Sequence, residues 1–391
     1  MGNLTPWKQG GRYKKIFLKG EIIMRKLALL LGSLLVVASA SAKEVVPAPV
    51  VVEEAPVQVI EKEVIVYRDK EEGFRPNGYV SLKYKYYGII EEQDNKHDGV
   101  KTNYGRTELM GKINMTEKQS FEYRIRRYND WNSTSVNNDE KGATGTQSRL
   151  RYFYNHGNLG DSKVNFTSRV HYLKGYSDEQ ELQYEAEFNF ADYMFNNDYV
   201  KTTDFTVAPM YRYGWDSNSD TYDNQLGVSL YTNTKLPLGF NLELNFYATQ
   251  HFYGKDQLFD YGKDKDDKNF TVDMELYLTN NVNLYATEKH SVDFTIDMGY
   301  DDYSWSNKKM FKSYTEKAAI TKAGSDNLGT DNTEYKLYAR PGIKYTYKVT
   351  PAMSVFGHVE AEYANFKYSN ENSARDFRWQ ALATVGMRTT F

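Results

Sequence analysis

The residues that could do chemistry in this chain are charged side chains that recur at every second position within short segments. The first group is basic and comprises Lys83, Lys85, Arg106, Lys112, Arg124, Arg126, Arg149, Arg151 and Arg169. The second group is acidic: Glu185, Glu187, Glu243, Asp273, Glu275, Asp293 and Asp297. Period-two spacing places such residues on one face of a β-strand. If both groups face water inside a low-dielectric wall, the wall focuses their field, and we expect this transverse field to align dipolar solutes and to slow apolar ones.

The same charges also fit a structural role, which is compatible with the first. Opposite charges on neighbouring strands form cross-strand ion pairs that stiffen a sheet. Glu122 with Arg124 and Glu108 with Arg106 are the pairs we expect on this interpretation. The spacing therefore leaves two roles open for one set of residues: they could produce an electric field across the lumen, or form ion pairs that stiffen the sheet.

Catalytic and metal-binding patterns are weak. His171, His251 and His358 fall on the polar faces, and Glu360 and Glu362 share a face with His358, but there is no Gly-x-Ser-x-Gly and no His-Glu-x-x-His. The acidic stretch 260–267 contains interleaved lysines and lacks the spacing of a calcium loop. The chain has no Cys, and its net charge of -3 does not suggest a nucleic-acid partner. We expect no enzyme, no cofactor and no metal.

The elements that must position these charges are amphipathic strands. In the final segment, Trp379, Ala381, Ala383, Val385, Met387 and Phe391 alternate with Gln380, Thr384, Arg388 and Thr390. The segment Tyr79–Tyr87 repeats this pattern. Pairing of these two segments would close the sheet, as β-structure in a bilayer requires, because an open edge leaves backbone groups without partners in hydrocarbon. The sequence therefore predicts an all-β, transmembrane antiparallel β-barrel.

Segments of this kind recur about fourteen times, each of a length that suits a tilted crossing of the bilayer. The links alternate between short ones, at 116–119, 157–162, 236–239 and 348–352, and long polar ones, at 89–103, 129–147, 254–268 and 304–332, as in outer-membrane barrels. Two links on the short side, 192–203 and 280–289, are longer than this rule favours, and a helical turn is expected at Ala191–Phe195. The loop 304–332 carries Lys308, Lys309, Lys312 and Lys317 and could constrict the lumen.

The N-terminal part divides into three. Residues 24–42 have the basic start, short apolar core and Ala40-Ser41-Ala42 site of a signal peptide. Residues 1–23 precede it and are interpreted as a mis-assigned upstream start. Residues 43–76 contain Pro47, Pro49 and Pro56 and predict an extended or disordered periplasmic segment. The barrel itself is expected to comprise residues 77–391.

The chain also resembles the FomA-type major outer-membrane porins of fusobacteria. The resemblance lies in Met24–Leu29, Ala42–Val45, Val64–Asp69, Arg75–Gly78, Arg149–Asn155, Ser162–Asn165, Phe190–Tyr193 and the terminal Phe391. It implies a voltage-gated, trimeric, general-diffusion channel whose surface loops contact host or bacterial cells. Phe391 would then be the signal read by the β-barrel assembly machinery.

The sequence therefore favours an outer-membrane porin, embedded in outer-membrane lipid, that passes small hydrophilic solutes and ions passively. One alternative is a substrate-specific channel with an aromatic slide, for which Tyr231, Tyr247, Tyr277 and Tyr338 are the candidate steps. Another is an adhesin whose barrel only displays loops.

Overall fold

The computed structural model describes residues 73–91, 103–130, 146–176, 179–216, 222–259, 264–308, 333–334, 336–365 and 377–391. The predicted upstream stretch and signal peptide lie outside these residues. The same holds for the predicted periplasmic segment, apart from residues 73–76.

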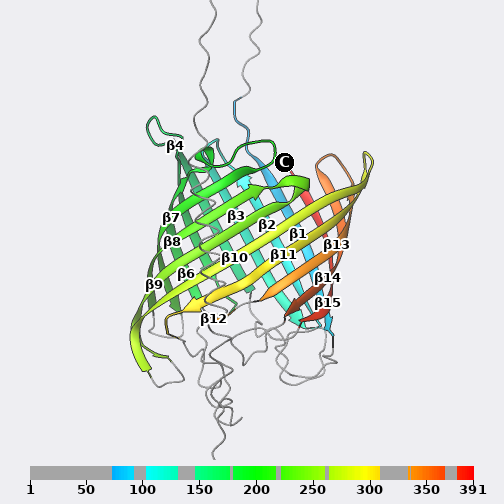
Figure 1. The fold of residues 1–391 in the computed structure, drawn as a ribbon. Helices are drawn as coiled ribbons and strands as arrows, with labels where there is room; N and C mark the ends of the chain where they lie inside the picture. The colour runs from blue at the N-terminus through cyan, green and yellow to red at the C-terminus, as the bar shows by residue number, and fades with distance from the viewer. Residues whose placement is uncertain are drawn as a thin grey trace, which may run out of the picture. The chain divides into compact units, whose positions relative to one another are not determined.

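The described chain consists almost entirely of long antiparallel strands that wind around a common axis (Figure 1). One short strand, β12 (Thr333–Glu334), pairs only with β11. The fourteen long strands are β1 (Asn77–Ile90), β2 (Tyr104–Asn114), β3 (Gln119–Asp130), β4 (Thr146–Asn158), β5 (Asn165–Lys174), β6 (Glu179–Asn189), β7 (Lys201–Asp216), β8 (Tyr222–Lys235), β9 (Asn241–Phe259), β10 (Asp264–Ala286), β11 (His290–Ser306), β13 (Leu337–Lys348), β14 (Met353–Asn365) and β15 (Phe377–Thr390).

The sheet closes on itself through its first and last strands. Each long strand pairs with its neighbour along the chain, and β1 pairs with β15 in a register that joins Leu82 to Met387. At one end of this seam the backbones of Gly78 and Phe391 exchange two hydrogen bonds, of 3.0 and 3.1 Å. The prediction of a closed antiparallel barrel of fourteen strands is therefore confirmed.

The short links follow the prediction at most positions. The expected helical turn is present as the 3-10 helix η1 (Ala191–Tyr193). A second such turn, η2 (Pro237–Gly239), connects β8 to β9, and Leu238 in it takes a positive φ of 61°. These compact turns keep consecutive strands adjacent and antiparallel.

The predicted length of two links is wrong. Strand β10 continues to Ala286 and β11 begins at His290, so the link placed at 280–289 is a tight turn. The link placed at 254–268 is also largely strand, because β9 runs to Phe259 and pairs with β10 from Asp264 onward. Backbone hydrogen bonds between two strands can continue beyond the hydrocarbon layer of the membrane. Outside this layer both faces of a strand can carry polar side chains, so the alternation of apolar and polar residues marks only part of each strand.

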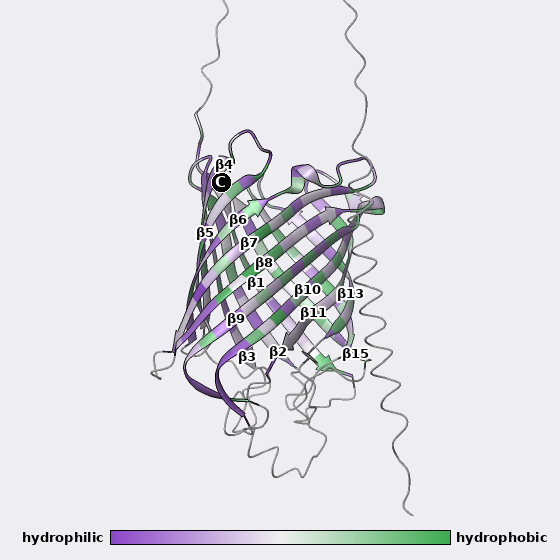
Figure 2. Cartoon of the chain, turned by 60° about the vertical axis from the view of Figure 1, so that its left-hand side comes forward, coloured by the Kyte–Doolittle hydropathy of each residue, from purple (hydrophilic) through white to green (hydrophobic). Residues whose placement is uncertain are grey.

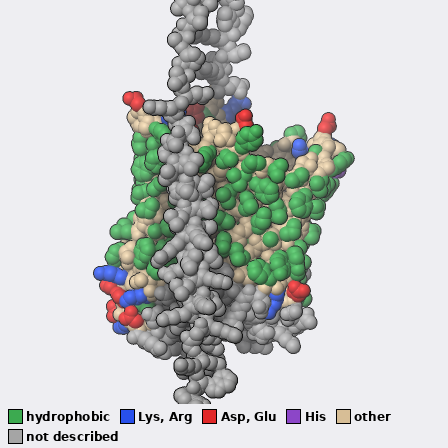
Figure 3. Space-filling view, viewed as in Figure 1, with side chains coloured by type: hydrophobic (Ala, Val, Ile, Leu, Met, Phe, Trp, Pro, Cys, Tyr) green, Lys and Arg blue, Asp and Glu red, His purple; other side chains and the backbone are tan. Residues whose placement is uncertain are grey.

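The distribution of side chains is inverted relative to a water-soluble protein. Apolar side chains such as Leu226, Val359 and Val385 are 54%, 64% and 61% exposed on the outer surface. Most of the buried side chains are polar or charged, and they lie on the alternate, inward face. Green and purple alternate along the strands in Figure 2, and Figure 3 shows an apolar band with charged side chains toward both of its ends.

One close approach between strands requires a glycine. The register of β10 against β11 shifts between Met274 and Leu276. There, a β-carbon added to Gly299 of β11 would lie 1.7 Å from the carbonyl oxygen of Leu276. By contrast, a β-carbon on Gly357 of β14 would meet no atom within 4 Å. The backbone of β11 can therefore lie this close to β10 only without a side chain at Gly299.

No helix in the described ranges is long and apolar enough to cross a membrane.

Candidate channel lumen

The inward face of the barrel carries all members of the basic group and the acidic group that the sequence singles out. The pairing places Lys85 opposite Arg106, Arg124 opposite Arg149, and Arg169 opposite Glu185 on this face. The remaining members share the same face through their own pairings: Lys83, Lys112, Arg126, Arg151, Glu187, Glu243, Asp273, Glu275, Asp293 and Asp297. Period-two alternation produces this arrangement, because the outward positions between them are the apolar ones.

A cavity of about 860 Å³ lies within the barrel, and its walls differ in charge. The basic wall is formed by β3, β4 and β5 and contributes Arg124, Arg126, Arg149, Arg151 and Arg169. The acidic side is formed by β6, β7, β8, β9 and β10. It contributes Glu187, Asp204, Glu243 and Glu275, with Tyr231, Tyr247 and Tyr277 among them. Because β3–β4 and β9–β10 lie about half a turn apart in the ring of strands, opposite charges face each other across the space.

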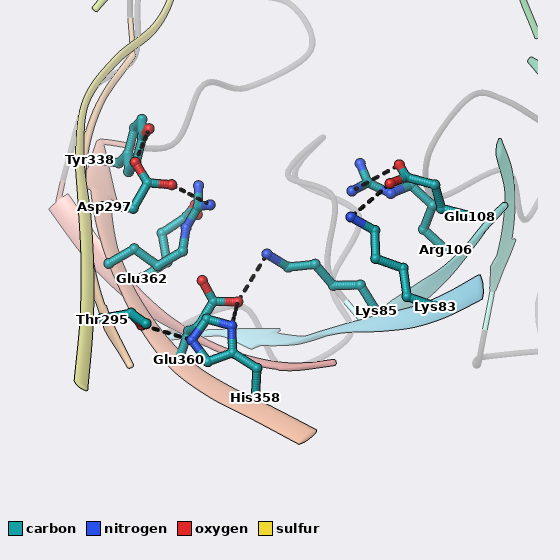
Figure 4. Close-up of polar contacts among 11 residues, drawn as sticks. Lys83, Lys85, Arg106, Glu108, Thr295, Asp297, Tyr338, His358, Glu360 and Glu362 are labelled. Carbon is teal, nitrogen blue, oxygen red and sulfur yellow. Dashed lines mark hydrogen bonds and ion pairs between the residues drawn. The ribbon is translucent and has the colours of Figure 1, made fainter. Parts of the chain in front are cut away.

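Part of the basic wall is neutralised by Glu108 on β2. Its carboxylate lies 2.7 Å from Lys83 Nζ and 3.8 Å from Arg106 Nη2, and it also accepts a hydrogen bond from Arg126. The Glu108 side chain is 2% exposed. Three cations thus surround one buried carboxylate, so this part of the wall is an ion-pair network. Figure 4 shows two of them, Lys83 and Arg106, beside Glu108.

A second network joins β1 to β11, β13 and β14. Arg340 lies 2.9 Å from Glu362 and 3.4 Å from Asp297, whose carboxylate also accepts a hydrogen bond of 2.8 Å from Tyr338. Lys85 reaches Glu360 at 3.2 Å. Lys83 and Lys85 are two positions apart on β1, and Figure 4 shows them turned toward different networks. Through Lys85 the second network crosses the seam that closes the barrel.

The third network is centred on Glu185, which is fully buried. Arg169 forms an ion pair with Glu185 and lies 3.0 Å from Glu187. Tyr231 donates to the two oxygens of Glu185 at 3.1 and 3.2 Å, and Arg169 donates to the Tyr231 hydroxyl at 2.6 Å. Arg169, Glu185, Glu187 and Tyr231 are therefore joined by ion pairs and hydrogen bonds in this part of the wall.

One of the two predicted wall pairs is wrong. Arg106 does lie within 3.8 Å of Glu108, as expected. Glu122, however, forms its ion pair with Lys112 at 3.1 Å and not with Arg124. Lys112 lies directly opposite Glu122 across the β2–β3 pair, whereas Arg124 is two positions along the same strand. Direct cross-strand neighbours are closer than neighbours along one face of a strand.

The other predicted acidic residues have mainly neutral partners. Glu243 accepts from Asn245 at 2.8 Å, Glu275 accepts from Tyr247 at 3.3 Å, and Asp273 accepts from Ser304. Asp293 accepts from Asn283 at 2.8 Å and from Ser291 at 2.9 Å. Neutral side chains thus donate hydrogen bonds to these carboxylates.

The candidate set from the sequence left out several members of the lumen. Glu108, Arg340 and Asp204 belong to its charged walls and were not singled out as pore-lining residues. The signal was available for Glu108 and Arg340, because each alternates with the apolar positions of its own strand. For Asp204 the alternation is obscured by a register shift between Thr202 and Asp204.

Two of the three candidate histidines, His251 and His358, lie in hydrogen-bonded chains that resemble hydrolytic triads, whereas the Nε2 atom of His171 is buried and has no hydrogen-bond partner among the described residues. His251 Nδ1 lies 2.7 Å from Asp223 and its Nε2 lies 3.1 Å from Thr271 Oγ1. His358 lies 3.5 Å from Glu360 and 2.8 Å from Thr295 Oγ1. Both threonines are in paired strands, where ladder bonds occupy backbone N–H groups that an oxyanion hole would need. In the parts of the chain that the structure covers, no cluster of His, Asp and Glu could hold a metal ion.

One ion cluster lies at the end of the β9–β10 hairpin, where polar residues occupy both faces beyond the apolar band. Lys308 Nζ is 2.7 Å from Asp264 and 2.5 Å from Asp266. Hydrogen bonding to Lys308 lowers the pKa of both carboxyls, and the pKa of Lys308 is raised for the same reason. Two carboxylates of the acidic stretch 260–267 thus form ion pairs with a lysine of the same chain. Lys309, Lys312 and Lys317, which were expected in the same loop as Lys308, lie outside the described residues.

No protein-family model and no curated protein matches the sequence. Among solved structures, the outer membrane channel DcaP of Acinetobacter baumannii is similar at 12% identity and a TM-score of 0.34, over 81% of this chain and 96% of that chain. The anion-selective porin from Comamonas acidovorans is similar at 10% identity and a TM-score of 0.30, over 81% and 99% of the two chains. Scores this low carry no argument, so the barrel assignment depends on the strand pairing.

Proposed function

We propose that this protein is an outer-membrane porin through which small hydrophilic solutes and ions diffuse passively. The observation that carries the proposal is the inverted barrel, with an apolar outer surface and a charged cavity of about 860 Å³ inside. An apolar band suits lipid, and interior charges that have no ion-pair partner among the residues described, such as Arg124, Arg149 and Arg151, are stable only when water reaches them. Barrels of about 8 strands are filled by side chains and those of about 16 leave an open channel. Fourteen strands are consistent with a narrow aqueous passage.

Conductance of the purified protein in planar lipid bilayers tests this proposal. Stepwise current increases in potassium chloride are the expected result, each step corresponding to insertion of one channel unit. A folded protein that inserts and produces no steps would contradict the porin assignment. Circular dichroism on the same preparation would establish that the barrel had folded.

Ion selectivity is assigned to the basic wall. Arg126 and Arg169 have carboxylate neighbours, so their fields are partly cancelled, whereas Arg124, Arg149 and Arg151 act on the lumen directly. Neutralising Arg124, Arg149 and Arg151 should move the reversal potential in a salt gradient toward that of a more cation-selective pore. An unchanged reversal potential would contradict this role for the arginines.

The tyrosines of the cavity favour a second candidate, a substrate-specific channel. Tyr231 and Tyr247 have ring centroids 5.8 Å apart, and Tyr277 lines the same space. Tyr338, the fourth predicted step, hydrogen-bonds with Asp297 in the second network and does not line this cavity. Liposome swelling with sugars of graded size separates the candidates, because a smooth size cutoff supports the general porin and saturation by one sugar supports the specific channel.

The proposal also includes the location, the oligomeric state and the assembly of the protein. The signal-peptide pattern and the apolar band support a place in outer-membrane lipid, and the FomA-type resemblance supports a homotrimer with loops that contact host or bacterial cells. Phe391 is then read by the β-barrel assembly machinery. Chemical crosslinking of the membrane-embedded protein should give a band at three times the monomer mass, and monomer alone would contradict the trimer.

A further inference from the structure

Three of the five arginines that line the cavity differ from the other two, Arg126 and Arg169. Within the described ranges, Arg126, Arg169, Arg212 and Arg340 each have a carboxylate within ion-pair distance. Arg124, Arg149 and Arg151 have none there, and all three line the cavity. These three residues, here termed the arginine cluster, occupy adjacent positions on β3 and β4, where Arg124 lies directly opposite Arg149.

The arginine cluster is electrostatically unfavourable as it stands. Like charges directly opposite each other on neighbouring strands destabilise a sheet. The nearest compensating carboxylate, Glu122, lies opposite Arg151 but is bonded to Lys112 at 3.1 Å. An arrangement that concentrates three cations on two strands is better explained by a charge that they share than by wall stiffening.

Unused hydrogen-bond donors point to the same conclusion. Among the described residues, the buried Nε atoms of Arg124, Arg151 and Arg169 have no hydrogen-bond partner, and Arg124 and Arg151 differ from Arg169 in that they also lack a carboxylate within ion-pair distance. Arg124 uses its Nη2 atom for one long contact of 3.3 Å with Gln147. A guanidinium group presents its donors as a planar fork that matches two oxygens of a phosphate or carboxylate. The arginine cluster can therefore offer several such donors to one ligand.

The opposite wall restricts what can bind there. Asp204 and Glu243 face the arginine cluster across the cavity and are held by neutral side chains such as Asn189 and Asn245. They repel an anion, so a negatively charged solute is placed against the arginines. A cavity of about 860 Å³ has room for a phosphate group together with a small organic body.

We propose that the arginine cluster is a binding site for small multivalent oxyanions, of which inorganic phosphate is the simplest. This inference rests on the proposed porin function, because the ligand reaches the site through the lumen. It goes beyond anion selectivity, since selectivity requires only a local field and a site requires saturable occupancy. A single chloride has no oxygens for the guanidinium forks, so it competes weakly.

The test is the current through single channels in potassium chloride as inorganic phosphate is added at neutral pH. We expect a saturable decrease in chloride current. Arg124→Gln and Arg151→Gln should each weaken the apparent affinity for phosphate by about tenfold or more, the size expected for losing a charged hydrogen bond. Lys344→Gln is the matched control, since Lys344 faces the lumen on β13 outside the cavity lining and has no ion pair in the described parts of the chain. It should leave the affinity for phosphate unchanged.

A sugar phosphate, with the free sugar as its neutral control, distinguishes the sources of the phosphate group. Equal block by inorganic phosphate and sugar phosphate supports a site for the free ion. Stronger block by the sugar phosphate supports a site in which the sugar lies against Tyr231 and Tyr247. Block by the free sugar to the same extent would overturn the oxyanion site.

The remaining outcomes separate the two proposals. Open channels whose current does not change with phosphate would overturn the site and leave the porin function standing. Equal weakening in Lys344→Gln and the two arginine variants would also overturn it, because the effect would then come from total charge. If no channels open, the porin function fails, and phosphate titration of the detergent-solubilised protein by calorimetry tests the site directly, with absence of heat overturning it.

Discussion

Replacing Glu185 with glutamine tests whether buried ion pairs hold the inner wall together. Glu185 is fully buried, forms an ion pair with Arg169 and accepts hydrogen bonds from Tyr231. Glutamine keeps the shape and removes the charge. Removing one partner of a buried pair costs about 3–5 kcal/mol. Because Glu187 remains 3.0 Å from Arg169, we expect the lower end of this range.

A loss of about 3 kcal/mol lowers the folding equilibrium constant roughly a hundredfold. The measurement is urea unfolding of the barrel in lipid vesicles, where the midpoint and slope give the free energy of unfolding. Glu243→Gln is the matched control, because it removes the same charge from a carboxylate bonded to Asn245. Glu243→Gln should lower the free energy of unfolding by about 1 kcal/mol, the typical net contribution of one hydrogen bond. A double-mutant cycle of Glu185→Gln with Arg169→Met isolates the pair itself.

The reasoning fails if Glu185→Gln costs no more than Glu243→Gln. It also fails if the coupling between Glu185 and Arg169 is close to zero. Either result would mean that lumen water screens this pair as it screens surface ion pairs. The networks around Glu108 and Glu362 would then stabilise the barrel little as well.

Three further predictions concern other parts of the barrel. Gly299→Ala should reduce the yield of folded barrel on refolding into detergent, because its β-carbon would overlap a carbonyl oxygen of β10, whereas Gly357→Ala should fold as the wild type does. Val385→Arg, on the outer surface, should cost about 2–4 kcal/mol of unfolding free energy in vesicles, and Asn233→Arg, which faces the cavity, should cost much less. Because Lys308 lowers the pKa of the two carboxyls it bridges, the bridge stabilises above the ordinary aspartate pKa and is lost as pH falls through the lowered value. Amide hydrogen exchange in residues 264–268 should therefore lose extra protection on acidification in the wild type and not in Lys308→Met.

The number and order of the strands could be predicted from the sequence because lipid and water act on alternate residues. In β15, for example, Trp379, Val385 and Met387 face outward and Gln380 and Thr384 face inward, as the pattern requires. Pairing of β15 with β1 follows from the need to satisfy every backbone group in hydrocarbon. Two physical constraints therefore determine most of the fold.

The ends of the strands and the partners of the charges could not be predicted in the same way. At the end where β9 joins β10, both strands extend beyond the apolar band, and the polar residues 254–257 and 264–269 give no hydrophobic alternation to mark their course. The pairing of Glu122 with Lys112 depends on the register between β2 and β3. A shift of that register by two residues would bring Met110 or Asn114 opposite Glu122 in place of Lys112, and the sequence of either strand alone does not contain this information.

The seam between β1 and β15 makes stable insertion of the barrel depend on the last strand of the chain. It joins Ser81 to the backbone of Met387, which is 306 positions away, whereas the other long strands pair with neighbours along the chain. A polypeptide without its final strand would present two bare edges to lipid, at a cost of several kcal/mol for each unsatisfied backbone group. A truncated chain that lacks β15 would thus be unable to persist in the bilayer, because its sheet cannot close.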